Sequence, residues 1–155
     1  MTSVGVSMLK LFESCRLRRY LDVAGVWTIG WGHAIKPGDG IGATITQRKA
    51  DDLLVADLAE HEAGMLASVT VDLTDPEADA LASFTFNVGV GAFARSTLLK
   101  RVNARETQAA ADQFLRWVYA AKVRQRGLVR RRSAEAARYL GASMLLVTAI
   151  YDGAA

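Results

Sequence analysis

The sequence predicts an α+β fold: a small N-terminal lobe with a β-hairpin or three-stranded sheet, joined by a long helix to a larger helical lobe. Apolar residues recur at helical spacing in residues 3–14, residues 18–35 show the glycine-rich alternation of strands, and helical periodicity dominates from residue 46 onward. At 155 residues the chain is long enough for one well-formed core and hardly long enough for two. We therefore expect a single folding unit.

The N-terminal lobe begins with a short helix over residues 3–14, in which Val6, Leu9 and Phe12 share one face. A β-hairpin is expected over residues 18–35, with its turn at residues 23–26. A Pro-Gly-Asp-Gly loop follows, and we expect Ile41 to Ile45 to add a third, edge strand. Together these elements form a small sheet beside one helix.

The linking helix is expected at about residues 46–67, with Thr46 as its N-cap. Its predicted apolar stripe consists of Ala50, Leu54, Leu58 and Met65. This divides the domain, residues 1–155, into lobe 1 at about 1–45, the linking helix, and a helical lobe at about 68–155.

The helical lobe should open at Asp75, because Pro76 favours the first turn of a helix, and the first helix should run to the break at Gly89-Val90-Gly91. Shorter helices are expected over residues 96–103, 106–119, 128–140 and 144–151. The predicted core of this lobe comprises Leu98, Leu99, Val102, Ala110, Phe114 and Trp117.

The chemistry of the chain concentrates between Glu13 and His33. Side chains alternate between the two faces of a strand, so Thr28 would share a nearly bare face with Gly30 and Gly32, whereas bulky residues fill the other face. A bare face that carries one hydroxyl suits a flat ligand, which predicts that Thr28 touches it. The alternation places His33 on the packed face, where we expect a structural, hydrogen-bonded histidine.

Two carboxylates flank this strand pattern in different surroundings. Glu13 follows an apolar helix near its C-terminal end, where partly negative carbonyls and apolar neighbours should keep its carboxyl group protonated. Asp22 lies in a polar turn, where water and backbone N–H groups should keep it ionised. One protonated and one ionised carboxyl group beside a cleft is the arrangement that cleaves glycosidic bonds.

The motifs Phe12-Glu13-x-x-Arg16-Leu17, Tyr20-x-Asp22 and Thr28-Ile29-Gly30-Trp31-Gly32-His33 resemble those of the phage-type lysozymes, the endolysins of glycoside hydrolase family 24. Later blocks resemble the family in the same order, namely Phe84-x-Phe86-Asn87-Val88-Gly89, Phe93-x-x-Ser96-Thr97-Leu98-Leu99, Phe114-x-x-Trp117 and Gly127-Leu128-Val129-x-Arg131-Arg132-x-x-Glu135. Ser14 departs from the pattern, because the family commonly has Gly after the catalytic Glu. The resemblance implies a lysozyme-like fold.

The resemblance implies a muramidase that hydrolyses the β-1,4 bond between N-acetylmuramic acid and N-acetylglucosamine in peptidoglycan. Glu13 would be the general acid, Asp22 would stabilise charge or activate water, and Thr28 would position that water. The substrate contacts it implies are Gly32 and Ala34 on the sheet side, and Phe86, Asn87, Ser96 and Arg131 in the helical lobe. Phe86 could instead serve core packing, and Ser96 could instead cap a helix.

No cofactor or metal is implied, because the two His and the acids lack a ligand spacing such as His-Glu-x-x-His. The first ten residues lack a secretory signal, and the longest apolar stretch, Met144 to Tyr151, is far shorter than the roughly 20 residues that span a bilayer. We expect a monomer that accumulates in the host cytoplasm without a stable membrane anchor. It would act on periplasmic peptidoglycan glycan strands after a holin-type helper permeabilises the membrane.

The net charge of +3 hides an asymmetry: residues 51–79 hold nine acids and no Lys or Arg, whereas residues 95–138 hold twelve basic residues and three acids. Solvated helix faces explain the acidic half. The basic cluster Lys122 to Arg132 would also suit nucleic-acid binding, although no recognised binding motif accompanies it, and we expect no nucleic-acid partner.

Two different functions would use the same wall substrate. A lytic transglycosylase would cleave the same bond by attack of the muramic 6-hydroxyl, with only one essential acid. A catalytically dead module would bind the wall without cleaving it. The presence of Asp22 and Thr28 argues against the transglycosylase. Intact Glu13, Asp22 and Thr28 argue against the catalytically dead module.

Overall fold

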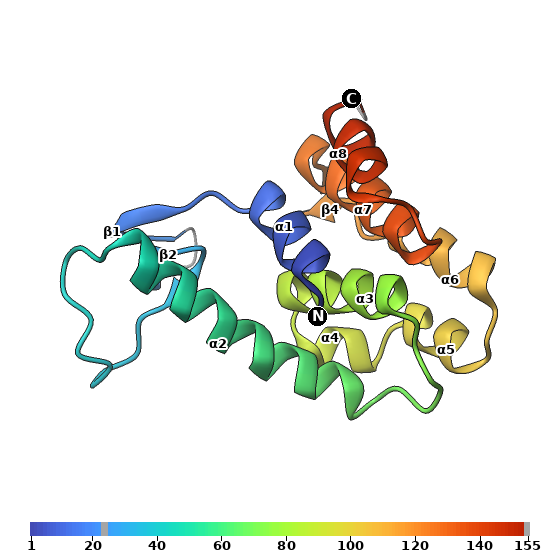
Figure 1. The fold of residues 1–155 in the computed structure, drawn as a ribbon, viewed down its shortest axis with the longest axis horizontal. Coiled ribbons are helices and arrows are strands. Elements are labelled where there is room, and N and C mark those ends of the chain that lie inside the picture. The colour runs from blue at the N-terminus through green and yellow to red at the C-terminus, as the bar shows by residue number, and fades with distance from the viewer. Residues whose placement is uncertain (23–24, 154–155) are drawn as a thin grey trace. The chain divides into compact units, whose positions relative to one another are not determined.

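The computed structural model describes residues 1–22 and 25–153 (Figure 1). The predicted α+β class is confirmed, with a three-stranded antiparallel sheet, a short two-stranded one and a mostly helical remainder. The chain forms two compact units, one of residues Lys10–Glu60 and one of Met1–Leu9 with His61–Ala155. The helices are α1 (Ser3–Phe12), α2 (Gln47–Leu66), α3 (Asp75–Val88), α4 (Val90–Ala94), α5 (Thr97–Asn103), α6 (Thr107–Phe114), α7 (Arg126–Tyr139) and α8 (Met144–Gly153).

The sheet of the Lys10–Glu60 unit consists of β1 (Arg16–Leu21), β2 (Trp27–Gly30) and β3 (His33–Ala34) in that order. The prediction of a third strand was right, but its position was wrong. The chain reverses at Trp31-Gly32, so that His33 pairs with Ile29. Residues 41–45 form no strand, although Thr44 makes one isolated bridge to Arg18.

Glycine explains this early reversal. Gly30 and Gly32 have φ of 65° and 99°, a backbone conformation that residues with a Cβ rarely adopt. Gly30 is also not on an open face, since a Cβ there would approach the Cβ of Ala50 in α2 to 3.3 Å. The expected bare ligand face at Gly30 is therefore wrong, because the helix covers that position.

The predicted stripe of α2 is confirmed. Ala50, Leu54, Leu58 and Met65 are all buried, and Ile29 of β2 is buried in the same unit as the first three. Thr46 caps the helix, because its Oγ1 accepts the Lys49 backbone N–H at 3.2 Å. The helix begins and ends within one residue of its predicted bounds.

The core of the second unit is built around Phe84 of α3. Its ring contacts those of Phe114 and Trp117 edge to face, with centroids 5.4 and 5.2 Å apart, and that of Phe93 at 6.3 Å. Leu98, Leu99, Val102, Ala110 and Phe114 are buried as predicted, and Trp117 packs against them. No helix among the described residues is long and apolar enough to cross a membrane.

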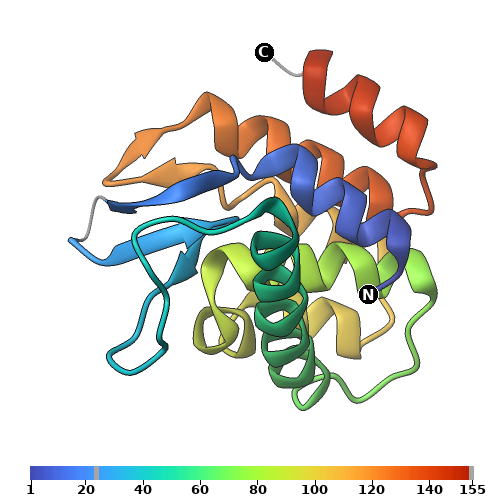
Figure 2. The same ribbon diagram turned by 60° about the vertical axis from the view of Figure 1, so that its left-hand side comes forward.

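A second hairpin was not predicted. The helix expected over residues 106–119 ends at Phe114, and β4 (Tyr119–Ala120) and β5 (Val123–Arg124) follow as a short antiparallel pair. Figure 2 shows these two orange strands directly before α7. Ala121 and Lys122 form the turn with φ of 48° and 65°, values that side chains disfavour, which is why the sequence alone did not indicate it.

Tyr139 gives the second unit a specific alkaline sensitivity. Burial, with the charge of Glu77 acting in the same direction, raises the pKa of Tyr139 to about 12 from an ordinary 10.0. Between these values the unfolded chain loses a proton that the folded protein retains, so the free energy of unfolding should fall as pH rises. Thermal unfolding followed across this range should show a shallower decline for Tyr139→Phe. Equal declines in both proteins would contradict the assignment.

Candidate active site

Glu13 stands directly after the last residue of α1, Phe12, and is half-buried. This is the predicted position at the C-terminal end of an apolar helix. The helix forms because Gly5, Met8 and Leu9 bury one side of it. The carboxyl group therefore projects from a chain segment that a packed helix holds in place.

Asp22 directly follows β1, and backbone hydrogen bonds to it close the hairpin. Its Oδ1 accepts the Val26 amide N–H at 2.8 Å, while its own amide N–H donates to the Val26 carbonyl at 3.0 Å. Its carbonyl also accepts the Gly25 N–H at 3.0 Å. Residues 23 and 24, the start of the predicted turn, lie outside the described residues.

Thr28 lies in the middle of the sheet, opposite Tyr20 on β1 and Ala34 on β3. It is 4% exposed, and its Oγ1 donates to the Val26 carbonyl at 3.1 Å. Because the hydroxyl proton is engaged with the Val26 carbonyl, Oγ1 can make further hydrogen bonds only as an acceptor. Val26 thus holds both side chains: its N–H binds Asp22 and its carbonyl binds Thr28.

The other predicted site residues differ in accessibility. Gly32 and Ala34 are exposed on the β2–β3 turn and β3. Phe86 is half-buried, with its ring centroid 5.1 Å from that of His61, and Asn87 is exposed. Ser96 is buried, and its Oγ accepts the Leu99 N–H at 3.0 Å as the N-cap of α5, so its side chain caps a helix.

Arg131 is part of a buried ionic cluster rather than of an open surface. Its Nε donates to Glu135 Oε1 at 3.0 Å, and its Nη2 donates to the Ser83 carbonyl at 3.1 Å. Glu135 is fully buried and also accepts Ser83 Oγ at 2.7 Å and Arg132 Nη1 at 2.5 Å. Arg132 packs over the Phe84 ring at 4.7 Å and donates to Asn87 Oδ1.

Solvated helix faces therefore do not account for all the charges of residues 51–138. Asp79 is fully buried and accepts hydrogen bonds from the Thr2 amide at 2.7 Å, Thr2 Oγ1 at 2.6 Å and Arg138 Nη2 at 2.8 Å. That explanation was wrong for Asp79. A buried charge needs such partners, because unpaired burial costs several kcal/mol, about the stability of many domains.

The sequence family described as Phage lysozyme matches residues 10–135 of the chain. The chain belongs to this phage lysozyme family. The matched residues include Glu13, Asp22 and Thr28 and extend through the Arg131–Glu135 cluster. Lysozyme activity, that of a glycoside hydrolase of family 24, follows from this membership, as does the role of an endolysin that lyses the host cell wall.

Individual relatives match this chain over most of their own lengths. The endolysin of Salmonella phage P22 is 44% identical over 124 residues, which cover 78% of this chain and 85% of that protein. The endolysin of Acyrthosiphon pisum secondary endosymbiont phage 1 is 37% identical over 139 residues, 87% of this chain and 94% of that protein. A crystal structure of a mutant P22 lysozyme aligns with a TM-score of 0.81 and 40% identity, covering 91% of this chain and 98% of its own.

Two polar pairs fix the sheet of this lysozyme to α2. His33 Nδ1 lies 2.9 Å from Asp57 Oδ2, so the expected hydrogen bond of His33 is confirmed. Trp31 Nε1 donates to Asp51 Oδ1 at 2.8 Å, and Lys10 Nζ lies 2.9 Å from the same oxygen. Hydrogen bonds from Lys10 and Trp31 lower the pKa of Asp51. The Asp51 pair was missed because nothing in the local sequence links a turn tryptophan to an acid 20 residues later.

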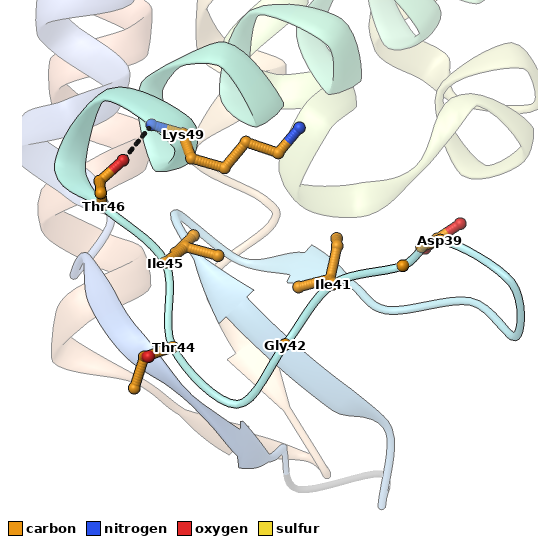
Figure 3. A pocket seen from close by; sticks show the side chains of 8 residues that line it. Asp39, Ile41, Gly42, Thr44, Ile45, Thr46 and Lys49 are labelled. Atoms are coloured by element: carbon orange, nitrogen blue, oxygen red, sulfur yellow. Dashed lines mark hydrogen bonds between the residues drawn. The ribbon is translucent and has the colours of Figure 1, made fainter.

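An open hollow of about 510 Å³ lies beside the loop that leads into α2. Figure 3 shows Lys49 extending from the first turn of α2 on the same side of the loop as Ile41 and Ile45, with Thr44 pointing away. None of the predicted site residues is among the described residues that line it. Within residues 1–22 and 25–153, no three His, Cys, Asp or Glu side chains gather as metal ligands.

Proposed function

We propose that this lysozyme hydrolyses the β-1,4 bond between N-acetylmuramic acid and N-acetylglucosamine of peptidoglycan, with Glu13 as general acid. The observation that carries the proposal is that the backbone of Val26 binds two of the three predicted catalytic side chains. Its N–H and carbonyl hold the Asp22 carboxylate and the Thr28 hydroxyl at 2.8 and 3.1 Å, so that an anion and an acceptor oxygen are fixed to one backbone residue. Prior fixation of reacting groups lowers the entropic part of a barrier.

Bond cleavage begins when Glu13 donates its proton to the glycosidic oxygen while the bond from the sugar C1 to that oxygen breaks. The bonding electrons leave with the oxygen, and positive charge develops on C1 and the ring oxygen. The attacking water bonds to C1. The Asp22 carboxylate either takes the proton of this water or stabilises the positive charge while the Glu13 carboxylate takes that proton. Thr28 Oγ1, whose proton is engaged by Val26, accepts a hydrogen bond from that water and orients it.

Substrate contacts follow from accessibility. The exposure of Gly32, Ala34 and Asn87 and the half-buried ring of Phe86 support direct contact with the glycan. Ser96 and Arg131 are buried and engaged, which supports a positioning role for them. Arg131 would act through the cluster that also orients Asn87 by way of Arg132.

The released sugar ends test the reaction. Hydrolysis should yield reducing N-acetylmuramic acid ends, because water supplies the hydroxyl at C1. Digestion of purified peptidoglycan followed by mass spectrometry of the fragments should show these ends, and proton NMR during early turnover gives the configuration at C1. 1,6-Anhydro ends would instead establish a transglycosylase and overturn the water-positioning role of Thr28.

We further propose that the enzyme reaches periplasmic peptidoglycan from the host cytoplasm through lesions made by a holin-type membrane permeabiliser. The likeness to phage endolysins supports this route. Cells that express the protein alone should grow normally and lyse soon after inner-membrane permeabilisation, as followed by turbidity. Spontaneous lysis with the protein recovered from the periplasm would contradict the route.

A further inference from the structure

Large apolar side chains are exposed on and beside the two strands of the β1–β2 hairpin. Leu17, Leu21, Val26 and Trp27 are 40%, 55%, 41% and 46% exposed. Leu21 lies opposite Trp27 in the sheet, so their side chains share one face. The Arg19 guanidinium lies over the Trp27 ring and so belongs to this face, whereas Val26, which directly precedes Trp27, points to the other face. We call the four exposed apolar residues, together with the arginines Arg16, Arg18 and Arg19 of β1, the hairpin patch, which includes both faces of the hairpin. Clustered exposed apolar side chains often mark an interaction surface.

The patch is strongly cationic. Residues 16–21 contain Arg16, Arg18 and Arg19 and no acid, and all three arginines are exposed. Within the described part of the chain, none of the three makes an ion pair with a carboxylate. The Arg19 guanidinium lies over the Trp27 ring at 5.0 Å, and that of Arg16 over Tyr20 at 4.4 Å. The nearby Asp22 carboxylate accepts the Val26 N–H.

We propose that the hairpin patch binds the surface of an anionic phospholipid bilayer. Arginines pair with lipid phosphates, and long side chains keep their charge at the headgroups while their stems cover apolar surface. Tryptophan favours the membrane–water interface, where its ring lies at headgroup depth. A soluble polyanion would use the arginines but gain nothing from Leu21, Val26 and Trp27, which is why the lipid surface fits better. The proposal does not depend on the catalytic assignments.

Co-sedimentation of the full chain with vesicles rich in phosphatidylglycerol tests the proposal, with pure phosphatidylcholine vesicles as reference. Arg18→Gln/Arg19→Gln should weaken binding about 30-fold, since each interfacial arginine contributes about a 5-fold gain. Leu21→Gln/Trp27→Gln should weaken it at least about 10-fold. On binding, tryptophan emission should shift to the blue in the wild type and much less in Trp27→Phe, which retains Trp31 and Trp117.

The β4–β5 hairpin supplies matched controls, because its side chains are also exposed, basic and apolar. Lys122→Gln/Arg124→Gln removes the same charge as the arginine variant. Tyr119→Gln/Val123→Gln removes a similar apolar surface, because Tyr119 and Val123 are 61% and 60% exposed. Both controls should bind within about 3-fold of wild type. Equal losses in patch and control variants would mean diffuse electrostatic attraction and would overturn the proposal.

Two other occupants are distinguished by the same variants. Polyphosphate binding that falls with Leu21→Gln/Trp27→Gln as steeply as vesicle binding would mean that a polyanion, not a bilayer, occupies the patch. A wild-type dimer that this variant converts to a monomer in sedimentation velocity would assign the patch to a second copy. Circular dichroism verifies folding. Were the apolar variant unfolded, the arginine variant and the Trp27 emission shift would decide, and an unshifted emission would refute lipid contact.

Discussion

Glu13→Gln should lower kcat on peptidoglycan by about 10² to 10⁴-fold, the range typical for loss of a general acid. The amide keeps the size and hydrogen-bonding capacity of the side chain but has no proton to give to the leaving sugar oxygen. Glu13 is half-buried just beyond α1, so the helix and fold should persist. Turnover of soluble peptidoglycan fragments measures the rate, and thermal unfolding establishes that the protein is intact.

Two further substitutions sharpen this test. Asp22→Asn should also impair turnover, but less severely, because water can partly replace a charge stabiliser. Glu60→Gln removes an equivalent carboxyl group from an exposed position on α2 and should leave the rate unchanged. Folded Glu13→Gln protein that turns over at the rate of Glu60→Gln would force the assignment of the acid to be abandoned.

The features that the sequence predicted well are those governed by local periodicity. The α2 stripe of Ala50, Leu54, Leu58 and Met65 is spaced four or seven residues apart, and this spacing alone places it on one face. Thr46 and Pro76 mark helix starts through backbone chemistry that depends only on neighbours in sequence. The elements built on such signals begin within about one residue of their predicted positions.

Features that depend on a few glycines or on distant partners were harder to predict. Period-two alternation continues from Trp27 to His33, but the positive φ of Gly30 and Gly32 reverses the chain within it. Opposite residues of an antiparallel pair share a face, so Ile29 and His33 still lie on the same side although they belong to different strands. The alternation therefore placed Ile29 and His33 on the same face correctly, although it assigned both residues to one strand.

The burial of Arg131, Arg132 and Glu135 could not be predicted from the sequence for a different reason. A run such as Arg130-Arg131-Arg132 looks like a solvated helix face. Burial of Arg131 and Arg132 depends on Glu135, four and three residues away, and also on Ser83 and Asn87 of α3, which lie 48 and 45 residues away in sequence. Burial of Glu135 depends equally on both arginines and on Ser83. Such a cluster has to be tested through stability as well as through activity.

Glu135→Gln should lower the free energy of unfolding by about 3 to 5 kcal/mol, because it removes the charge of the buried carboxylate that the Arg131 and Arg132 guanidinium groups both contact. The amide oxygen can still accept one hydrogen bond, but the charge that offsets Arg131 and Arg132 is gone. Against a typical total of about 5 to 15 kcal/mol, this loss is large. Urea denaturation followed by circular dichroism measures this loss, provided that the Glu135→Gln protein is folded at low temperature.

Glu106→Gln provides the matched control, because Glu106 also pairs with an arginine, Arg101, but both side chains are 45% exposed. Its loss should cost no more than about 1 kcal/mol. A joint replacement of Arg131 and Arg132 by Met and Glu135 by Leu should recover much of the stability lost in Glu135→Gln, because it removes the two buried guanidinium charges together with their carboxylate. If Glu135→Gln were as stable as Glu106→Gln, the buried cluster would contribute no more than a surface ion pair, and the positioning of Asn87 through Arg132 would lose its physical basis.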